Sequence, residues 1–521
     1  MTAPSVEYSL LAPMLLIFGV AVAGVVVEAF APRGARYRIQ FGLAMTGVIA
    51  AFGALVSAYR QTGPDGTLAA VGAVAVDRPA LFLQGVILLV AALGLLLIAE
   101  RADGSPSATA GSGLNAFTAQ ASAVPGSVAE LVATRAGAAQ TEVFPLTMFA
   151  VAGMMLFPAS ADLLTAFIAL EVFSLPLYLL CGLARHRRLL SQEAALKYFL
   201  LGAFSSAFFL YGMALIYGYA GTLSLTGIAD AVRTGSGPTT LAVIGTALLA
   251  VALLFKVSAV PFHAWVPDVY QGAPTAVTAF MAAGTKIAAF GALLRLCDVA
   301  VPDLKDQWRP VLWAVAILTM AVGTVTAITQ RDVKRLLGYS AIAHTGFLLT
   351  GVIAANPAGV SGTLFYLAAY GFTTIGMFAF VSAVRGPDGA EQTDLAAWAG
   401  LGRRFPVAGV VFALYLLSLA GIPLTSGFVS KFAVFTAAAA GGAVPLVVIG
   451  VLASSVAAYF YVRVIVLMFF TDPPAEAPDF RAPGAMTLVA IAVPLAITFL
   501  LGVFPQPVLD LADAAARFIG S

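Results

Sequence analysis

A lysine and a proline interrupt one of the most apolar stretches of the chain, LLFKVSAVPFHAW, residues 253–265. If this stretch crosses a membrane, Lys256 lies where a charged side chain costs roughly 2.5–3.5 kcal/mol on insertion scales. Pro261 lacks a backbone N–H and clashes with the turn before it, so a helix must break close to it. We therefore expect a broken membrane helix whose free backbone groups meet protein or water at membrane depth.

Four more ionisable side chains lie in similarly apolar runs: Glu171, Lys197, Lys286 and Lys431. Such groups indicate an ion or proton path, because they are costly to keep inside a membrane. Lysine suits proton transfer because its pKa responds to burial and to neighbouring carboxylates, whereas arginine stays charged. Two simpler alternatives remain open. Glu171 and Lys256 could form an ion pair of structural value only, and Lys197 is close enough to a helix end to reach the cytoplasmic surface.

Two histidines are further candidates for moving protons. His344 lies in the middle of an apolar run, and a histidine there can relay protons because it titrates near neutral pH. It can equally be a neutral packing residue. His263 follows Pro261 near the cytoplasmic end of its helix and could connect water to the interior.

The composition identifies the solvent. Of the 521 residues, 61% are hydrophobic and 10% are charged, against about 25% charged in soluble domains. The chain is therefore a membrane protein throughout, and its scattered basic residues give no sign of nucleic-acid binding. Its two cysteines form no metal or iron–sulfur motif, and no nucleotide-binding loop occurs, so we expect no cofactor and no metal in this chain. Residues 1–8 lack a basic leader, which favours a retained first helix.

About 20 apolar residues are needed to cross a bilayer. The sequence predicts about fourteen such transmembrane helices and an all-α, polytopic fold. The expected spans are 10–30, 39–59, 80–99, 143–159, 163–183, 194–219, 241–261, 275–296, 311–329, 336–355, 362–384, 405–440, 444–470 and 486–504. The span 405–440 is too long for one pass and contains Pro423, so we expect a second broken helix there.

The loops after the odd-numbered spans carry most of the loop lysines and arginines. This asymmetry predicts that those loops are cytoplasmic and that both termini lie on the outer side of a cell membrane. Residues 100–142 are rich in Ala, Gly, Ser and Thr, which predicts a flexible cytoplasmic insertion.

Two parts of the chain repeat the same pattern. Residues 196–198 (LKY) precede 204–206 (FSS), and residues 364–366 (LFY) precede 372–374 (FTT) at the same spacing. The copies are an odd number of spans apart, so they must cross the membrane in opposite directions, as inverted repeats do. We therefore expect two inverted five-helix repeats, each with a broken helix. The predicted units are three N-terminal helices (1–99), the insertion (100–142), the first repeat (143–306), the second repeat (307–470) and a terminal helix (471–521).

Several stretches resemble the antiporter-like membrane subunits of respiratory complex I. They are residues 255–268 with 272–275, residues 170–178, residues 332–340 and residues 421–431. The resemblance covers nearly the whole chain. The short C-terminal end and the lysine at 431 resemble the subunit N branch of bacterial NADH:quinone oxidoreductase.

The resemblance implies a function and roles for individual residues. Glu171 pairs with and tunes Lys256, Lys286 is the central relay, and Lys431 is the terminal proton donor or acceptor. His344 and Lys197 join the same polar axis. The chain would conduct protons across the bacterial plasma membrane, beside other membrane subunits and lipid, while FMN, iron–sulfur clusters and quinone belong to partner subunits. A sodium/proton antiporter subunit of a multi-subunit exchanger and a structural membrane spacer are the alternatives.

Overall fold

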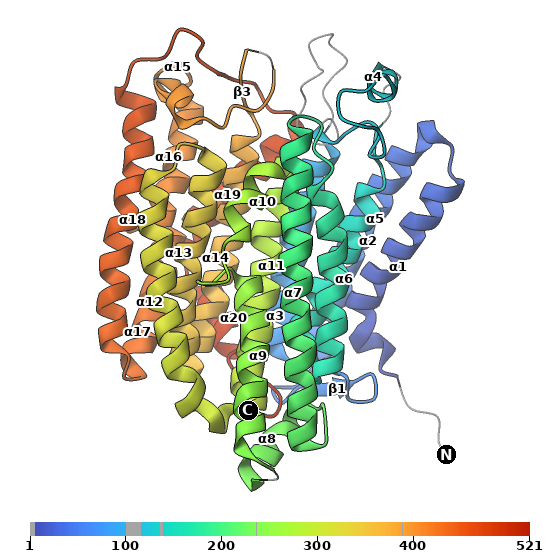
Figure 1. Cartoon of the computed structure of the whole chain (residues 1–521), viewed down its shortest axis with the longest axis vertical. Coiled ribbons are helices and arrows are strands. Elements are labelled where there is room, and N and C mark those ends of the chain that lie inside the picture. Colours follow the sequence, from blue (N-terminus) through green and yellow to red (C-terminus); the bar gives the residue numbers. More distant parts are fainter. Residues whose placement is uncertain (1–5, 101–115, 136–138, 236, 388) are drawn as a thin grey trace.

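Long helices run side by side along the whole height of the molecule (Figure 1). This computed structural model describes residues 6–100, 116–135, 139–235, 237–387 and 389–521. The helices are α1 Tyr8–Phe30, α2 Arg33–Gln61, α3 Arg78–Ala99, α4 Val128–Arg135, α5 Val143–Leu156, α6 Leu163–Cys181, α7 Arg188–Ala220, α8 Leu225–Thr234, α9 Thr239–Val257, α10 Trp265–Gly272, α11 Thr275–Arg295, α12 Lys305–Thr329, α13 Val333–Ala354, α14 Pro357–Val381, α15 Leu401–Arg404, α16 Pro406–Ala420, α17 Ser426–Ala440, α18 Val444–Phe470, α19 Ala485–Val503 and α20 Gln506–Ala514.

The expected all-α membrane architecture is confirmed, with 12 helices in the described part long and apolar enough to cross a membrane. The predicted span 143–159 is a shorter apolar helix, and the break predicted within 405–440 divides that span into α16 and α17. Four short strands, which the sequence did not predict, pair in two connections: β1 Thr67–Ala69 with β2 Val74–Val76, and β3 Val384–Arg385 with β4 Asp479–Phe480.

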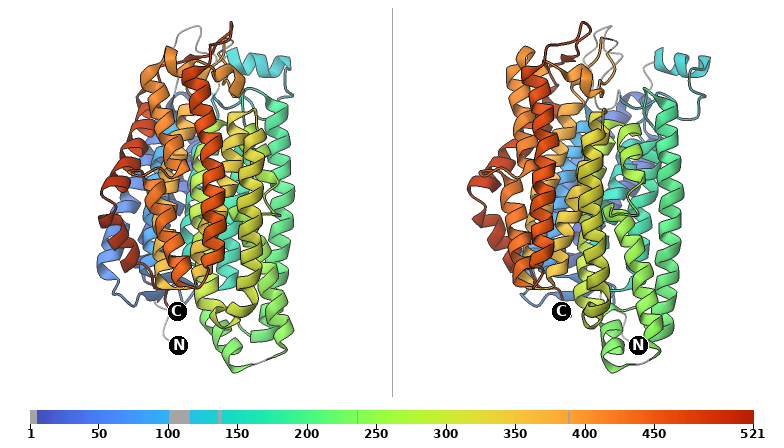
Figure 2. Two further views of the ribbon diagram at one scale, coloured as in Figure 1. Left: turned by 90° about the vertical axis from the view of Figure 1, so that its left-hand side faces the viewer. Right: turned by 60° about the vertical axis from the view of Figure 1, so that its left-hand side comes forward.

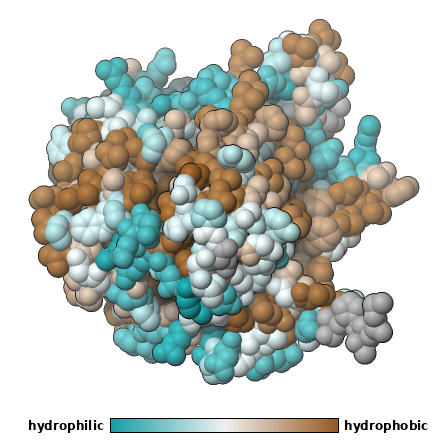
Figure 3. Space-filling model, turned by 60° about the horizontal axis from the view of Figure 1, so that its bottom comes forward, coloured by the Kyte–Doolittle hydropathy of each residue, from teal (hydrophilic) through white to brown (hydrophobic). Residues whose placement is uncertain are grey.

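Burial divides the bundle into an inner and an outer set of helices. Every residue of α11 is buried, as is every residue of α14 from Gly359 onward, whereas α18 and α1 leave many large apolar side chains exposed. Figure 1 shows α18 at the left edge of the bundle, and in the left view of Figure 2 this helix faces the viewer. In Figure 3, brown hydrophobic side chains spread over the flanks and hydrophilic ones gather at the end that comes forward. This distribution is what a multi-pass membrane protein requires, because lipid surrounds its sides and water its ends.

Two aspartates begin matching helices at opposite ends of the molecule. Asp162 caps the N-terminus of α6 and bridges to Ser224, and Asp332 caps α13 and bridges to Asp394. The residues joined by each bridge are equally far apart in the sequence. The first bridge leads into α8 at the bottom of Figure 1, and the second lies beyond β3, whose label is at the top. The first residues of α1 and the C-terminus of the chain lie at the α8 end.

Part of the predicted insertion packs against the bundle. Its helix α4 is held by Arg188, whose guanidinium donates 2.9 Å hydrogen bonds to Glu130 and to the Ala123 carbonyl. Phe117 forms a β-bridge with Ala184. Composition alone did not predict this local structure, because the contacts are made with residues of another helix. Residues 101–115 and 136–138 of the insertion lie outside the described residues.

Candidate functional site

Lys256 lies in the last turn of α9 and is 1% exposed. Its ammonium donates to the Ser174 hydroxyl at 2.7 Å and to the Tyr178 hydroxyl at 3.3 Å, both on α6. The nitrogen also lies 5.4 Å from the ring centroids of Phe173 and Tyr178. Hydroxyl groups and aromatic faces therefore stabilise the charge of Lys256, which lipid could not do.

Glu171 stands one turn before Ser174 on α6 and is half-buried at the side of the bundle. Its carboxylate accepts a hydrogen bond from the Ser206 hydroxyl of α7. Within the described chain, no ion pair joins Glu171 to Lys256, which differs from the direct pairing that the resemblance implied. Each group has other partners: Lys256 donates to Ser174 and Tyr178, and Glu171 accepts from Ser206.

α9 ends at Val257, four residues before the span boundary expected at Pro261, and the break begins at Ser258. Ser258 adopts a left-handed conformation with φ of 70° and donates to the carbonyls of the preceding turn. Side chains of other helices then form hydrogen bonds with the backbone groups that the break leaves without a helical partner. The Val260 N–H donates to the Thr319 hydroxyl at 2.9 Å, and the Trp265 indole donates to the Phe255 carbonyl at 3.1 Å. Side chains thus stabilise the break where regular hydrogen bonding ends.

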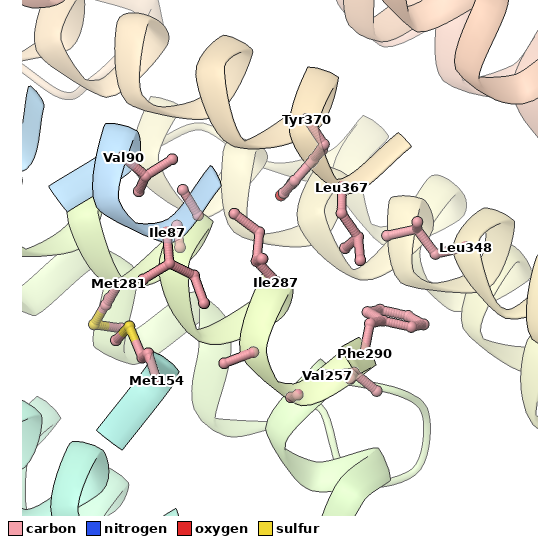
Figure 4. Close-up of a cluster of buried hydrophobic side chains, with 14 of the residues drawn as sticks. Ile87, Val90, Met154, Val257, Met281, Ile287, Phe290, Leu348, Leu367 and Tyr370 are labelled. Carbon is pink, nitrogen blue, oxygen red and sulfur yellow. The ribbon is translucent and has the colours of Figure 1, made fainter. Parts of the chain in front are cut away.

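Lys286 lies in the centre of α11, the fully buried helix, and is 1% exposed. Its ammonium donates to the Ala341 carbonyl at 2.5 Å and to the Thr345 hydroxyl at 2.8 Å, both on α13. The ring of Tyr370 on α14 lies 5.0 Å from the nitrogen. Figure 4 shows the apolar core around this helix, with Tyr370 and Val257 among its members.

His344 is buried on α13, next to Thr345. Its Nδ1 is hydrogen-bonded to the Tyr366 hydroxyl at 2.7 Å and its Nε2 to the Tyr461 hydroxyl at 3.2 Å. Its ring centroid lies 5.3 Å from that of Tyr370, the residue that covers Lys286. The histidine therefore contacts both Tyr370, which covers Lys286, and Tyr461 of α18.

Lys431 lies on α17, just after the second broken helix, and is 5% exposed. Its ammonium donates to the carbonyls of Leu419 at 2.9 Å and Ala420 at 3.0 Å, which end α16. It also donates to the Ser454 hydroxyl at 2.8 Å. Because α16 ends at Ala420, the carbonyls of its last two residues are available to hold this charge.

Lys431 is close to both its buried neighbours and the outside of the bundle. Its nitrogen lies 4.9 Å from the ring of Phe347, whose own ring centroid is 5.6 Å from that of His344. On its other side, a cavity of about 330 Å³ is lined by Lys431, Ser454 and Phe432 and opens between α17 and α18. Lys431 thus lies between the buried ring of Phe347 and this cavity.

The structure does not bring Lys197 and His263 into this series. Lys197 is 42% exposed and forms ion pairs with Glu193 and Asp268, each at 2.7 Å. Burial raises the pKa of the Asp268 carboxyl, but hydrogen bonds from Lys197 and Arg335 outweigh it and hold that pKa below its usual value. His263 lies between α9 and α10 and, in the described part of the chain, makes no hydrogen bond to any of the buried lysines.

The series contains hydroxyl residues that sequence reasoning missed. They are Ser174, Tyr178, Ser206, Thr345, Tyr366, Tyr370, Ser454 and Tyr461. Serine, threonine and tyrosine are common in membrane helices, so their identity alone does not mark them. The available signal was proximity in sequence, because Ser174 follows Glu171 by one turn and Thr345 is next to His344.

Residues 160–457 match the family described as NADH:quinone oxidoreductase/Mrp antiporter, TM. NADH-quinone oxidoreductase subunit N of Rhodococcus opacus is 64% identical over 99% of this chain and 97% of its own length. The subunit N of Mycobacterium tuberculosis is 63% identical over 99% of both chains. The chain belongs to the subunit N family of NADH-quinone oxidoreductases. It is an antiporter-like membrane subunit of that translocase and is involved in proton translocation.

Solved structures share this fold along the whole chain. A chain of respiratory complex I from Thermus thermophilus is 31% identical, with a TM-score of 0.76 over 96% of this chain and all of that chain. A chain of the Mrp complex from Dietzia has a TM-score of 0.81 at 21% identity, over 98% of this chain and 97% of its own. Subunit N proteins carry no redox cofactor, because FMN and iron–sulfur clusters sit in other subunits. Among the described residues of this chain, no three His, Cys, Asp or Glu side chains gather as a metal site.

Proposed function

We propose that this chain conducts protons along the series Glu171, Lys256, Lys286, His344 and Lys431, driven by quinone reduction elsewhere in the assembly. The observation that carries the proposal is the series of contacts between Lys256 and Lys431. Thr345 connects Lys286 with the Val257 carbonyl beside Lys256, Tyr370 lies between Lys286 and His344, and Phe347 lies between His344 and Lys431. Lys197 and His263 lie outside this route.

The partners of the three lysines support proton transfer over simple charge pairing. In the described chain, Lys256, Lys286 and Lys431 are held by hydroxyl and carbonyl oxygens and by no carboxylate. Hydroxyl groups can donate to a neutral amine as well as accept from an ammonium. Both charge states of each lysine can therefore be hydrogen-bonded without moving a helix.

The two broken helices support the same function. Regular helices leave no free backbone groups at membrane depth, whereas a break leaves carbonyls that can hold a cation or water. Lys431 uses two such carbonyls of α16, and Lys256 lies in the turn that ends α9. We infer that water fills these breaks when the protein conducts.

The matching aspartate bridges support an inverted repeat. The bridges of Asp162 and of Asp332 join equally spaced positions and lie at opposite ends of the bundle. We infer two repeats of opposite orientation, residues 143–306 and 307–470, which follow the N-terminal helices 1–99 and the insertion and precede 471–521. We also infer that the end bearing both termini faces outward and that α4 and β3 lie on the cytoplasmic side.

The test measures proton translocation in the assembled enzyme. Lys286→Met keeps the apolar stem and removes the charge, so it should abolish most translocation per NADH oxidised. Lys305→Met, at the first residue of α12, serves as the matched control and should retain it. Unchanged translocation in a fully assembled Lys286→Met enzyme would show that the buried series is not the route.

The similarity to the Mrp complex shows the fold alone, yet it makes sodium/proton exchange the alternative to test. Sodium-dependent exchange that continues without NADH or quinone would favour that function. A structural spacer is a third possibility. It predicts that paired, charge-neutral replacements at Glu171 and Lys256 retain full activity.

A further inference from the structure

Three buried groups meet at the hydroxyl of Thr345, a fully buried residue of α13. The Lys286 ammonium donates to this hydroxyl at 2.8 Å. The hydroxyl itself donates to the Val257 carbonyl at 2.5 Å and lies 3.2 Å from the Ala341 carbonyl. Thr345 therefore connects the central lysine with the broken end of α9, on the residue that directly follows Lys256.

A threonine hydroxyl has a single proton and two lone pairs. A charged Lys286 can only donate, so Thr345 must accept from it and direct its own proton elsewhere. The shorter of its two contacts goes to Val257. With Lys286 charged, the Val257 carbonyl is hydrogen-bonded.

The Val257 carbonyl needs this partner. Val257 is the last residue of α9, and the chain leaves the helix at Ser258, so the N–H that a continuing helix would supply is not in place. The residue is fully buried, and a buried carbonyl without a hydrogen bond is costly. The hydroxyl of Thr345 meets that need from a neighbouring helix.

A neutral Lys286 changes this arrangement. Its amine has a lone pair and becomes the strongest acceptor near Thr345, whose proton can then turn from Val257 to the amine. The other titratable groups that face this place are Tyr370 of α14 and His344 of α13. Neither of them has a hydrogen bond to Val257 that could replace the lost one.

We propose that Thr345 is a positioning residue that couples the charge of Lys286 to the broken end of α9, and through it to Lys256. The inference rests on the proposed proton route and goes beyond it, because it assigns the link between two of its lysines. Charging Lys286 fixes the Val257 carbonyl, and discharging Lys286 releases it. The last turn of α9, which carries Lys256, then becomes free to rearrange.

The experiment compares variants in the assembled enzyme reconstituted in vesicles, with protons moved per NADH oxidised as the readout. Thr345→Val keeps the shape and removes the hydroxyl, and should lower this ratio roughly tenfold. Thr345→Ser keeps the hydroxyl and should restore most of it. Thr350→Val is the matched control, since Thr350 is equally buried on α13 but bonds only to the Phe347 carbonyl of its own helix.

A double-mutant cycle separates coupling from a general loss of structure. In a Lys286→Met background, Thr345→Val should cause no further loss, because the charge that it transmits is gone. An equal loss in both backgrounds, or the same loss in Thr350→Val, would overturn the inference. If Thr345→Val does not assemble, Thr345→Cys, a weaker donor of similar size, takes its place in the cycle.

The same set of variants distinguishes two failures. If Lys286→Met loses translocation while Thr345→Val retains it, the coupling is wrong and the proton route stands. If Lys286→Met itself retains translocation, the proposed route fails and the coupling fails with it.

Discussion

The Lys256 ammonium donates its 2.7 Å hydrogen bond to Ser174, one turn beyond Glu171 on the same helix. A neutral hydroxyl thus accepts the hydrogen bond that Glu171 was expected to accept from Lys256. Lys256 is thus not held in a closed ion pair, in which each charge would keep the other in place.

Ser174→Ala should therefore uncouple Glu171 from Lys256. Hydrogen bonds to charged groups contribute roughly 1.5–3 kcal/mol, so we expect a loss of translocation of about tenfold or more. Ser455→Ala is the control, because Ser455 is exposed on α18 and bonds only within its helix. Equal proton-to-NADH ratios in the two variants would contradict a role for Ser174.

Gly421 should be required for the position of Lys431. Its φ is +87°, and a Cβ there would lie 3.2 Å from both Cδ and Nζ of Lys431. Gly421→Ala should cost roughly 1–2 kcal/mol in backbone strain and also displace the ammonium. Gly442→Ala has a similar φ of +79° and open space, so it reports the strain alone. Translocation should fall in Gly421→Ala only, and a parallel fall in both would attribute the effect to the backbone.

The buried ion pair of Asp77 and Arg295 should anchor the C-terminal tail. The pair is 2.7 Å long with both side chains at most 3% exposed, and Asp77 also accepts from the Ile519 N–H. Arg295→Met leaves a buried carboxylate unpaired and should destabilise the protein by roughly 3–5 kcal/mol. Thermal stability and proteolysis of the C-terminal tail measure this.

The exposed pair of Arg233 and Asp303 provides the comparison for that variant. Arg233→Met should change stability by about 1 kcal/mol or less, because water and salt screen exposed pairs. Comparable destabilisation by Arg295→Met and Arg233→Met would mean that the buried pair does not anchor the tail.

Lys197→Met should leave proton translocation close to that of the unmodified enzyme. Lys197 lies in an exposed network with Glu193 and Asp268, and Asp268 keeps its 2.6 Å contact with Arg335 when Lys197 is removed. The expected loss of stability is about 1 kcal/mol or less. A loss of translocation as large as that of Lys286→Met would place Lys197 on the proton route after all.

Several features of the fold could be predicted because lipid imposes strict rules on sequence. Apolar runs of sufficient length marked the spans, and Pro423 marked the division between α16 and α17. Helix ends were less predictable. α7 begins at Arg188, six residues before the predicted span, because a helix continues into water where polar residues can still form its hydrogen bonds. Only the apolar part of such a helix has a signature in the sequence.

The sequence by itself determined that charges lie inside the membrane and that two helices break near them. Lysine within an apolar run and proline within a span leave no other outcome in lipid. Only the tertiary structure decided that Lys256 meets Ser174, that Lys286 meets Thr345, and that Lys197 faces the surface. Those choices depend on how neighbouring helices are rotated and shifted against each other, and a hydrogen bond is made or lost within about 1 Å of such a shift.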